Sequence, residues 1–145
     1  MDASSASIQR DHGSMVRNAF AIFLAAHGIV HWIGFAVPWG LLKTESFTAK
    51  TTILAGQVDV GDGGTKLIAV LWLPVLAGFV VAAWGVWRAT PWSLPLTLAV
   101  ALASLVLCVL AAPQAILGVV IDVAIVAAIL VRPLWPAAHG PRWSR

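Results

Sequence analysis

Charged side chains are scarce in this sequence: Lys, Arg, Asp and Glu together make up only 10% of its 145 residues. Soluble domains carry about 25% charged residues, which cover their surfaces. Because 60% of the residues here are hydrophobic, the chain lacks the polar side chains that a water-soluble surface needs. A lipid bilayer removes that need, since hydrocarbon tails solvate apolar side chains directly. We therefore expect an integral membrane protein.

The sequence also lacks the signatures of several other classes of protein. Its single cysteine, Cys108, excludes an intramolecular disulfide. It contains no Walker phosphate-binding loop and no GxSxG, HExxH or CxxC motif, which argues against the corresponding enzymes. Its formal charge of +3 comes from scattered basic residues rather than one dense patch, so we expect no nucleic-acid partner. Nothing in the sequence identifies a cofactor, and we expect none.

Four apolar runs occupy most of the chain, at residues 19–42, 67–87, 92–112 and 115–131. About 20 apolar residues in a helix cross the hydrocarbon core, and the first three runs reach that length. The fourth is near the lower limit for a span. We expect an all-α, four-helix transmembrane bundle over residues 17–132. The alternative is that the last two runs form a re-entrant hairpin.

The segments outside these runs are short and mostly polar. Residues 1–16 are polar and Ser-rich, which predicts a flexible N-terminal tail. Residues 43–66 form the only long loop, and its GDGG sequence predicts a turn. Residues 133–145 are expected to form a C-terminal tail on the headgroups. Pro38 is expected to end the first helix early.

The orientation in the membrane follows from the positions of Lys and Arg, which are in excess in cytoplasmic loops. With four spans, six of them fall on the side of the two tails and three on the side of the long loop. We therefore expect a bacterial plasma-membrane protein with both termini in the cytoplasm. The first set is Arg10, Arg17, Arg88, Arg132, Arg142 and Arg145, and the second is Lys43, Lys50 and Lys66.

Small residues recur within the apolar runs. In lipid, helices associate where glycine and other small residues let their backbones approach closely. We expect five glycines to lie at helix contacts, namely Gly28, Gly34, Gly78, Gly85 and Gly118.

Three ionisable side chains lie inside the runs: His27 and His31 in the first, and Asp122 in the fourth. Residues four apart share a face of a helix. An ionisable group at mid-bilayer usually faces the bundle interior and a partner, so we expect Asp122 to face His27 or His31. Ser104 and Cys108 in the third run are also four apart and are candidates to line the same interior. Ser104 is expected to bond within its own helix, and Cys108 to fill space.

This polar cluster has two interpretations, which the sequence leaves open. In the structural one, the imidazoles and the carboxyl group bond to one another and fix helix packing. In the functional one, His27, His31 and Asp122 form a metal site, a ligand set that suits zinc, or a site that handles protons. The spacing of two histidines by itself does not specify a metal.

The segment HGIVHWIGF at residues 27–35 resembles a group of small bacterial four-span membrane proteins with an HGxxHxxGF pattern in their first helix. The likeness extends to LWL at 71–73 and to an A-x-x-G-x-x-x-N pattern, matched by Ala115, Gly118 and Asp122. Here an acid replaces the final Asn, so the resemblance does not carry a role for that position. It implies a four-span fold. Some members are labelled permease, but no transporter motif is present in this sequence.

For function, we expect a non-enzymatic accessory or assembly subunit of a membrane complex. Its partners would be the lipid bilayer and either other membrane subunits or further copies of itself. One alternative is a small oligomeric transporter or ion- or proton-conducting protein that uses the His/Asp cluster. The other is a metal- or quinone-dependent membrane oxidoreductase. A subunit predicts a co-purifying partner, a transporter predicts a water-accessible cavity at the cluster, and an oxidoreductase predicts a bound metal or chromophore.

Overall fold

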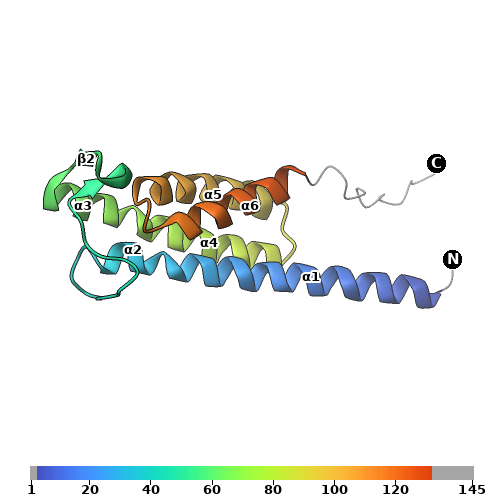
Figure 1. Cartoon of the computed structure of the whole chain (residues 1–145). Helices are drawn as coiled ribbons and strands as arrows, with labels where there is room; N and C mark the ends of the chain where they lie inside the picture. Colours follow the sequence, from blue (N-terminus) through green and yellow to red (C-terminus); the bar gives the residue numbers. More distant parts are fainter. Residues whose placement is uncertain (1–2, 132–145) are drawn as a thin grey trace.

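The described part of the chain folds mostly into helices (Figure 1). The computed structural model describes the backbone of residues 3–131 and the side chains of residues 13–131, and the predicted C-terminal tail at 133–145 lies outside this part. A small antiparallel hairpin interrupts the helices, with Thr52 paired to Asp59 and Ile53 to Val58. The elements in order are α1 (Ala3–Val30), α2 (Trp32–Ala36), β1 (Thr52–Ile53), η1 (Leu54–Gly56), β2 (Val58–Asp59), α3 (Gly61–Val70), α4 (Trp72–Trp87), α5 (Ser93–Leu110) and α6 (Ile116–Leu130).

Three helical stretches are long and apolar enough to cross a membrane. They are Gly13–Ala36, Gly61–Trp87 and Ser93–Leu110. The fourth, α6, is also apolar but has only 15 residues. The expectation of a mostly helical protein with membrane-spanning segments therefore agrees with the structure.

The helices lie side by side, with α2 continuing the column of α1 and α4 that of α3 (Figure 1). Helix α1 packs on α4, α4 on α5, and α5 on α6. Helices α1 and α6 thus stand at the two ends of this series. The long loop and the α5–α6 turn lie at the same end of the molecule, where the Ala55 N–H donates to the Ala112 carbonyl (3.1 Å) and the Thr48 N–H donates to Oε1 of Gln114 (3.0 Å).

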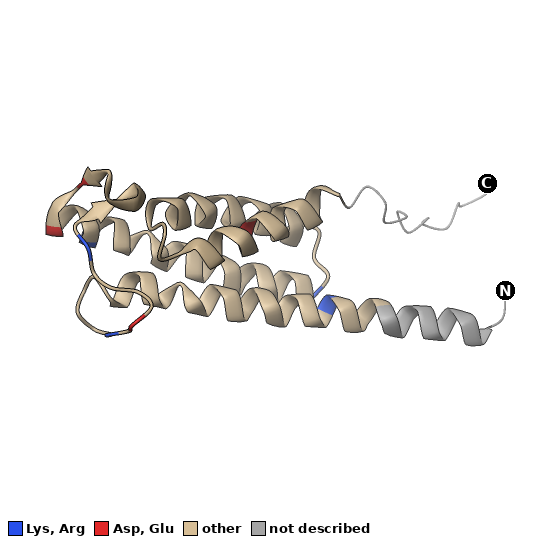
Figure 2. Ribbon diagram, in the orientation of Figure 1, with Lys and Arg blue, Asp and Glu red and all other residues tan. Residues whose placement is uncertain are grey.

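Charged residues gather near the two ends of the described helices, with a single acidic exception in the middle (Figure 2). That exception is Asp122, which is fully buried. A long apolar stretch with charges only at its ends suits a bilayer, because a charged group is costly in the hydrocarbon region unless it has a partner.

Helix α1 begins earlier than the sequence predicts. The backbone is helical from Ala3, within residues 1–16, for which the sequence predicts a flexible tail. Residues 3–16 contain no proline and one glycine, Gly13. Nucleation is the costly step in helix formation, and later residues add at little cost. A polar segment joined to a stable apolar helix can therefore continue that helix.

Helices α1 and α2 form one column that is interrupted at His31. The His31 Nδ1–H donates to the carbonyl oxygen of His27 (2.8 Å), which is the acceptor that the backbone N–H of His31 would use in a regular α-helix. That N–H bonds instead to the carbonyl of Gly28 (3.1 Å). A side chain that enters the hydrogen-bond ladder accounts for the break.

The first column ends at Ala36, earlier than the predicted residue 42. Pro38 follows two residues later. Val37 before it keeps helical backbone angles, but Pro38 has no N–H to donate to the carbonyl four residues earlier, so the helical hydrogen-bond ladder stops there. The prediction that this proline shortens the first helix is therefore confirmed.

Helix α3 begins at Gly61, so the second helical column starts six residues before residue 67. Within GDGG, the positive φ expected of a turn occurs at the first residue, Gly61 (φ 68°), and the other three residues are helical. Oδ1 of Asp59 accepts a hydrogen bond from the Gly61 N–H (2.9 Å). Asp62 lies in the first turn, where the helix dipole favours a negative charge. These two acids start the helix at a sequence whose glycines by themselves favour a turn.

Each of the five glycines expected at helix contacts lies where another side chain leaves no room for a Cβ atom. Close approach of helices in lipid depends on such positions. Gly28 and Gly34 face Phe79 and Trp72 of α4, Gly78 faces Val100 of α5, Gly85 faces Trp92, and Gly118 faces Cys108 of α5.

We expect Gly28→Ala to lower the free energy of unfolding by about 1–3 kcal/mol, as overpacking does in well-packed cores. An added Cβ would lie 2.6 Å from Cβ of Phe79 and 3.3 Å from the Leu76 carbonyl oxygen. Gly13→Ala is the matched control in the same helix, because a Cβ there meets nothing within 4 Å. It should stabilise by up to about 1 kcal/mol. Denaturant titration in mixed micelles, followed by circular dichroism, measures both; equal effects would contradict the packing.

Candidate functional site

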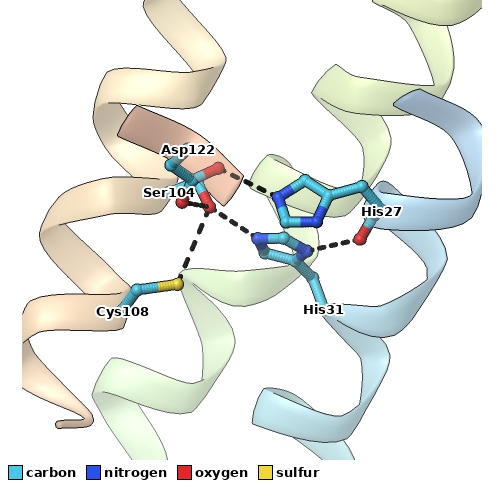
Figure 3. A network of polar contacts seen from close by, with 5 residues as sticks. All are labelled: His27, His31, Ser104, Cys108 and Asp122. Carbon is cyan, nitrogen blue, oxygen red and sulfur yellow. Dashed lines mark hydrogen bonds and ion pairs between the residues drawn. The ribbon is translucent and has the colours of Figure 1, made fainter. Parts of the chain in front are cut away.

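A buried polar cluster joins three helical columns near their middle (Figure 3). It consists of His27 and His31 from the α1–α2 column, Ser104 and Cys108 from α5, and Asp122 from α6. Ser104 and Asp122 are fully buried, and His27, the most accessible of the five, is 7% exposed. The three ionisable residues singled out in the sequence are therefore brought together in one place.

The hydrogen bonds of the cluster form a continuous chain. The His27 Nε2–H donates to Oδ1 of Asp122 (2.9 Å). Oδ2 of Asp122 lies 2.6 Å from Oγ of Ser104, and Oγ lies 2.6 Å from Nε2 of His31. The His31 Nδ1–H donates back to the carbonyl oxygen of His27 (2.8 Å). The chain thus starts and ends on the same residue and ties α1 to α5 and α6.

Asp122 bonds directly to His27, one of the two partners expected for it, and reaches the other, His31, through Ser104. The expectation that Ser104 bonds within its own helix missed these contacts between helices. The signal that could have found them is its place in the middle of an apolar run, where a hydroxyl gains most from a polar partner. Sγ of Cys108 lies 3.9 Å from Oγ of Ser104, at the edge of the cluster.

The directions of these hydrogen bonds fix the number of protons that the cluster holds. A carbonyl oxygen only accepts, so Nδ1 of His31 carries a proton. Ser104 has a single hydroxyl proton for two contacts of 2.6 Å, one to a carboxyl oxygen and one to an imidazole nitrogen. If Asp122 were ionised while His31 was neutral, one of these contacts would have no proton. A buried polar contact without its hydrogen bond costs about 1–3 kcal/mol.

Two arrangements with zero net charge satisfy every link. In one, Asp122 is ionised, Ser104 donates to it, and His31 is an imidazolium that donates to Ser104. In the other, Asp122 is protonated and donates to Ser104, which donates to Nε2 of neutral His31. The two differ only by a shift of protons through the serine hydroxyl. The cluster therefore shares one proton between an acid and a base on different helices.

Aromatic rings enclose the cluster. Phe79 of α4 meets the His27 ring edge-on, with centroids 4.9 Å apart, and the Trp72 ring lies 5.3 Å from that of His31. Phe23, one turn before His27, stacks parallel to it at 6.2 Å. Such rings exclude water, which strengthens the hydrogen bonds that they surround.

The candidate metal ligands also meet a geometric requirement. One donor atom from each of His27, His31 and Asp122 lies within 4.8 Å of the other two, and all three residues are buried. Zinc binds imidazole nitrogen and carboxylate oxygen at about 2.0–2.2 Å. A nitrogen cannot coordinate a metal while it donates a hydrogen bond, so a metal on Nε2 of His27 would replace its bond to Asp122.

One wall of the cluster borders a groove of about 450 Å³ between α1 and α6. Both histidines contribute to it, and the remaining lining is mostly apolar. Ser46, Phe47 and Gln114 contribute to its lining near the long loop and the α5–α6 turn. The groove lies between the two helices that stand at the ends of the packing series.

In comparisons with known proteins, no protein-family model, no curated protein and no solved structure matches the chain.

We expect Asp122→Asn to be tolerated, with a change in unfolding free energy within about 1 kcal/mol. Its amide oxygen can accept from His27 and its NH₂ can donate to Ser104, as protonated Asp122 does. Asp122→Ala leaves the His27 Nε2–H unpaired and removes one of the two contacts of Ser104, which should cost about 1–3 kcal/mol. Unfolding in mixed micelles compares the two variants. If Asn destabilises as much as Ala, the cluster requires an ionised carboxylate, and the arrangement with protonated Asp122 is wrong.

Proposed function

We propose that this chain is a four-span integral protein of the bacterial plasma membrane with both termini in the cytoplasm. Support comes from the order of the columns, in which α6 runs antiparallel beside α5 (Figure 1). It also comes from the basic residues, six of which fall on the side of the tails and three on the side of the loop. Both termini lie on the same side only if α6, the shortest of the four proposed spans, also crosses the membrane.

Thiol labelling of intact cells tests this topology. In a Cys108→Ala background, we expect a membrane-impermeant maleimide to label Glu45→Cys in the long loop, but to label Ser144→Cys near the C-terminus only after the cells are lysed. Four spans place these positions on opposite sides. Labelling of both in intact cells would mean that α6 does not cross.

We further propose that the protein is a non-enzymatic subunit of a membrane complex. The observation that carries this proposal is the exposure of α6, of whose 15 residues only Asp122 and Ile125 are buried. The helix is about 22 Å long at 1.5 Å per residue, against a hydrocarbon core of about 30 Å. A short span is accommodated by bilayer thinning or by association with another protein.

The polar cluster agrees with a role without catalysis. Within the described part of the chain, its chemistry-bearing groups are bonded mainly to one another, as they are in a clamp that holds helices together. A catalytic acid or base has to reach the proton of a substrate. Asp122 and Ser104 are fully buried and bonded within the cluster.

A zinc-binding protein is the second candidate, because three donor atoms from His27, His31 and Asp122 lie within 4.8 Å of one another. In that case the metal would take the place of the shared proton and hold the same helices together. This candidate is distinguished from the first by what the purified protein contains.

Native mass spectrometry of the protein, purified in mild detergent from its own membrane, tests both candidates. We expect a complex heavier than the 15.3 kDa chain, and Val120→Trp on the exposed face of α6 should weaken it. Val81→Trp, on the exposed face of α4, is the matched control. A lone chain of unaltered mass would contradict the subunit proposal. One zinc per chain by elemental analysis, lost in His31→Ala, would favour the second candidate.

A further inference from the structure

One imidazole nitrogen on the wall of the α1–α6 groove, Nδ1 of His27, is not used by the cluster. Nε2 of His27 bonds to Asp122, but no described residue bonds to its Nδ1. Within the described residues, every side-chain nitrogen or oxygen that is shielded from solvent has a hydrogen-bond partner. Nδ1 of His27 must therefore reach an open surface. His27 is 93% buried and lines the groove, so the groove is where this atom is accessible.

The hydrogen bonds of the cluster determine what this atom can do. In both neutral arrangements, the single imidazole proton of His27 is on Nε2, where it is donated to Asp122. Nδ1 then has a lone pair and accepts hydrogen bonds. An acceptor on an apolar wall selects a ligand with an O–H or N–H donor. It gives nothing to a ligand that carries only carbonyl or ether oxygens.

From these two observations we propose that the α1–α6 groove binds a lipophilic molecule that carries a hydroxyl group, whose O–H donates to Nδ1 of His27. The volume of about 450 Å³ falls in the range of small-molecule sites, which are mostly apolar with a few polar groups that orient the ligand. The apolar lining includes Phe23 and Val30 of α1 with Leu117 and Ile121 of α6. In a membrane these surfaces suit an alkyl chain.

The position of His27 within the groove supports a hydroxyl ligand over a helix from a partner. Phe23 stacks parallel to the His27 ring, and Phe47 and Gln114 border the same groove. The groove thus borders the loop side of the molecule instead of following the full length of α1. An unpaired imidazole nitrogen in hydrocarbon would also gain by pairing with a donor. An apolar partner helix would leave it unpaired.

The groove ligand is independent of the subunit proposal, which depends on the exposed face of α6. A complex that forms without any ligand would not contradict the groove proposal. Ligand binding by a chain that forms no complex would not support the subunit proposal.

Photolabelling of the protein in nanodiscs with a diazirine derivative of dodecanol tests the proposal, with the methyl ether of the same compound as the matched probe. The unaltered protein is used for both, so folding is not in question. We expect the ether to bind about tenfold more weakly or worse, because it cannot donate to Nδ1. The alcohol should label peptides of α1 and α6.

Two variants locate the site. Val30→Trp fills the groove and should abolish specific labelling by the alcohol. Ile22→Trp is the control, because Ile22 is on the same helix and is exposed but does not line the groove. Circular dichroism verifies that both variants fold. Equal binding of alcohol and ether, labelling that Val30→Trp leaves unchanged, or crosslinks from the groove to another polypeptide would each overturn the proposal.

Discussion

The hydrogen bond between His27 and Asp122 is the interaction on which the rest of this structure depends. It joins the first helix of the bundle to the last, and these two helices do not form one of its main packing contacts. A carboxyl group in hydrocarbon needs a partner. Asp122 bonds to His27 of α1 and also to Ser104 of α5, so its burial holds α6 against both helices. One polar residue thus constrains the arrangement of four columns.

The second constraint is that the cluster shares its protons. The hydroxyl of Ser104 has one proton but two close partners, Asp122 and His31. Either Asp122 or Nε2 of His31 must therefore carry a further proton. The shared proton keeps the cluster neutral, which a low-dielectric interior favours. It also fixes the tautomer of His27, and through it the acceptor that faces the groove. The clamp that holds the helices and the polarity of the groove are therefore two consequences of the same hydrogen bonds.

Helix packing and helix shape follow from a few local features. Glycines such as Gly28 let α1 approach Phe79 of α4 closely, and this approach brings aromatic rings around the histidines. His31 interrupts its own helix by bonding to the carbonyl of His27. That bond turns Nε2 of His31 toward Ser104. A break in the helix is thus part of how the site is built.

The sequence by itself determined the apolar segments long enough to span a membrane, the histidine pair on one face and the acid that had to meet it, because hydropathy and helical spacing are local properties. It did not determine the helical state of residues 3–16 or the helix start at Gly61, since both depend on how a neighbouring segment folds. The bond from Ser104 to other helices, the choice of His27 as the direct partner of Asp122, and the groove were decided only by tertiary structure. Each depends on the distance between atoms of different helices, and no periodicity within one helix encodes that distance.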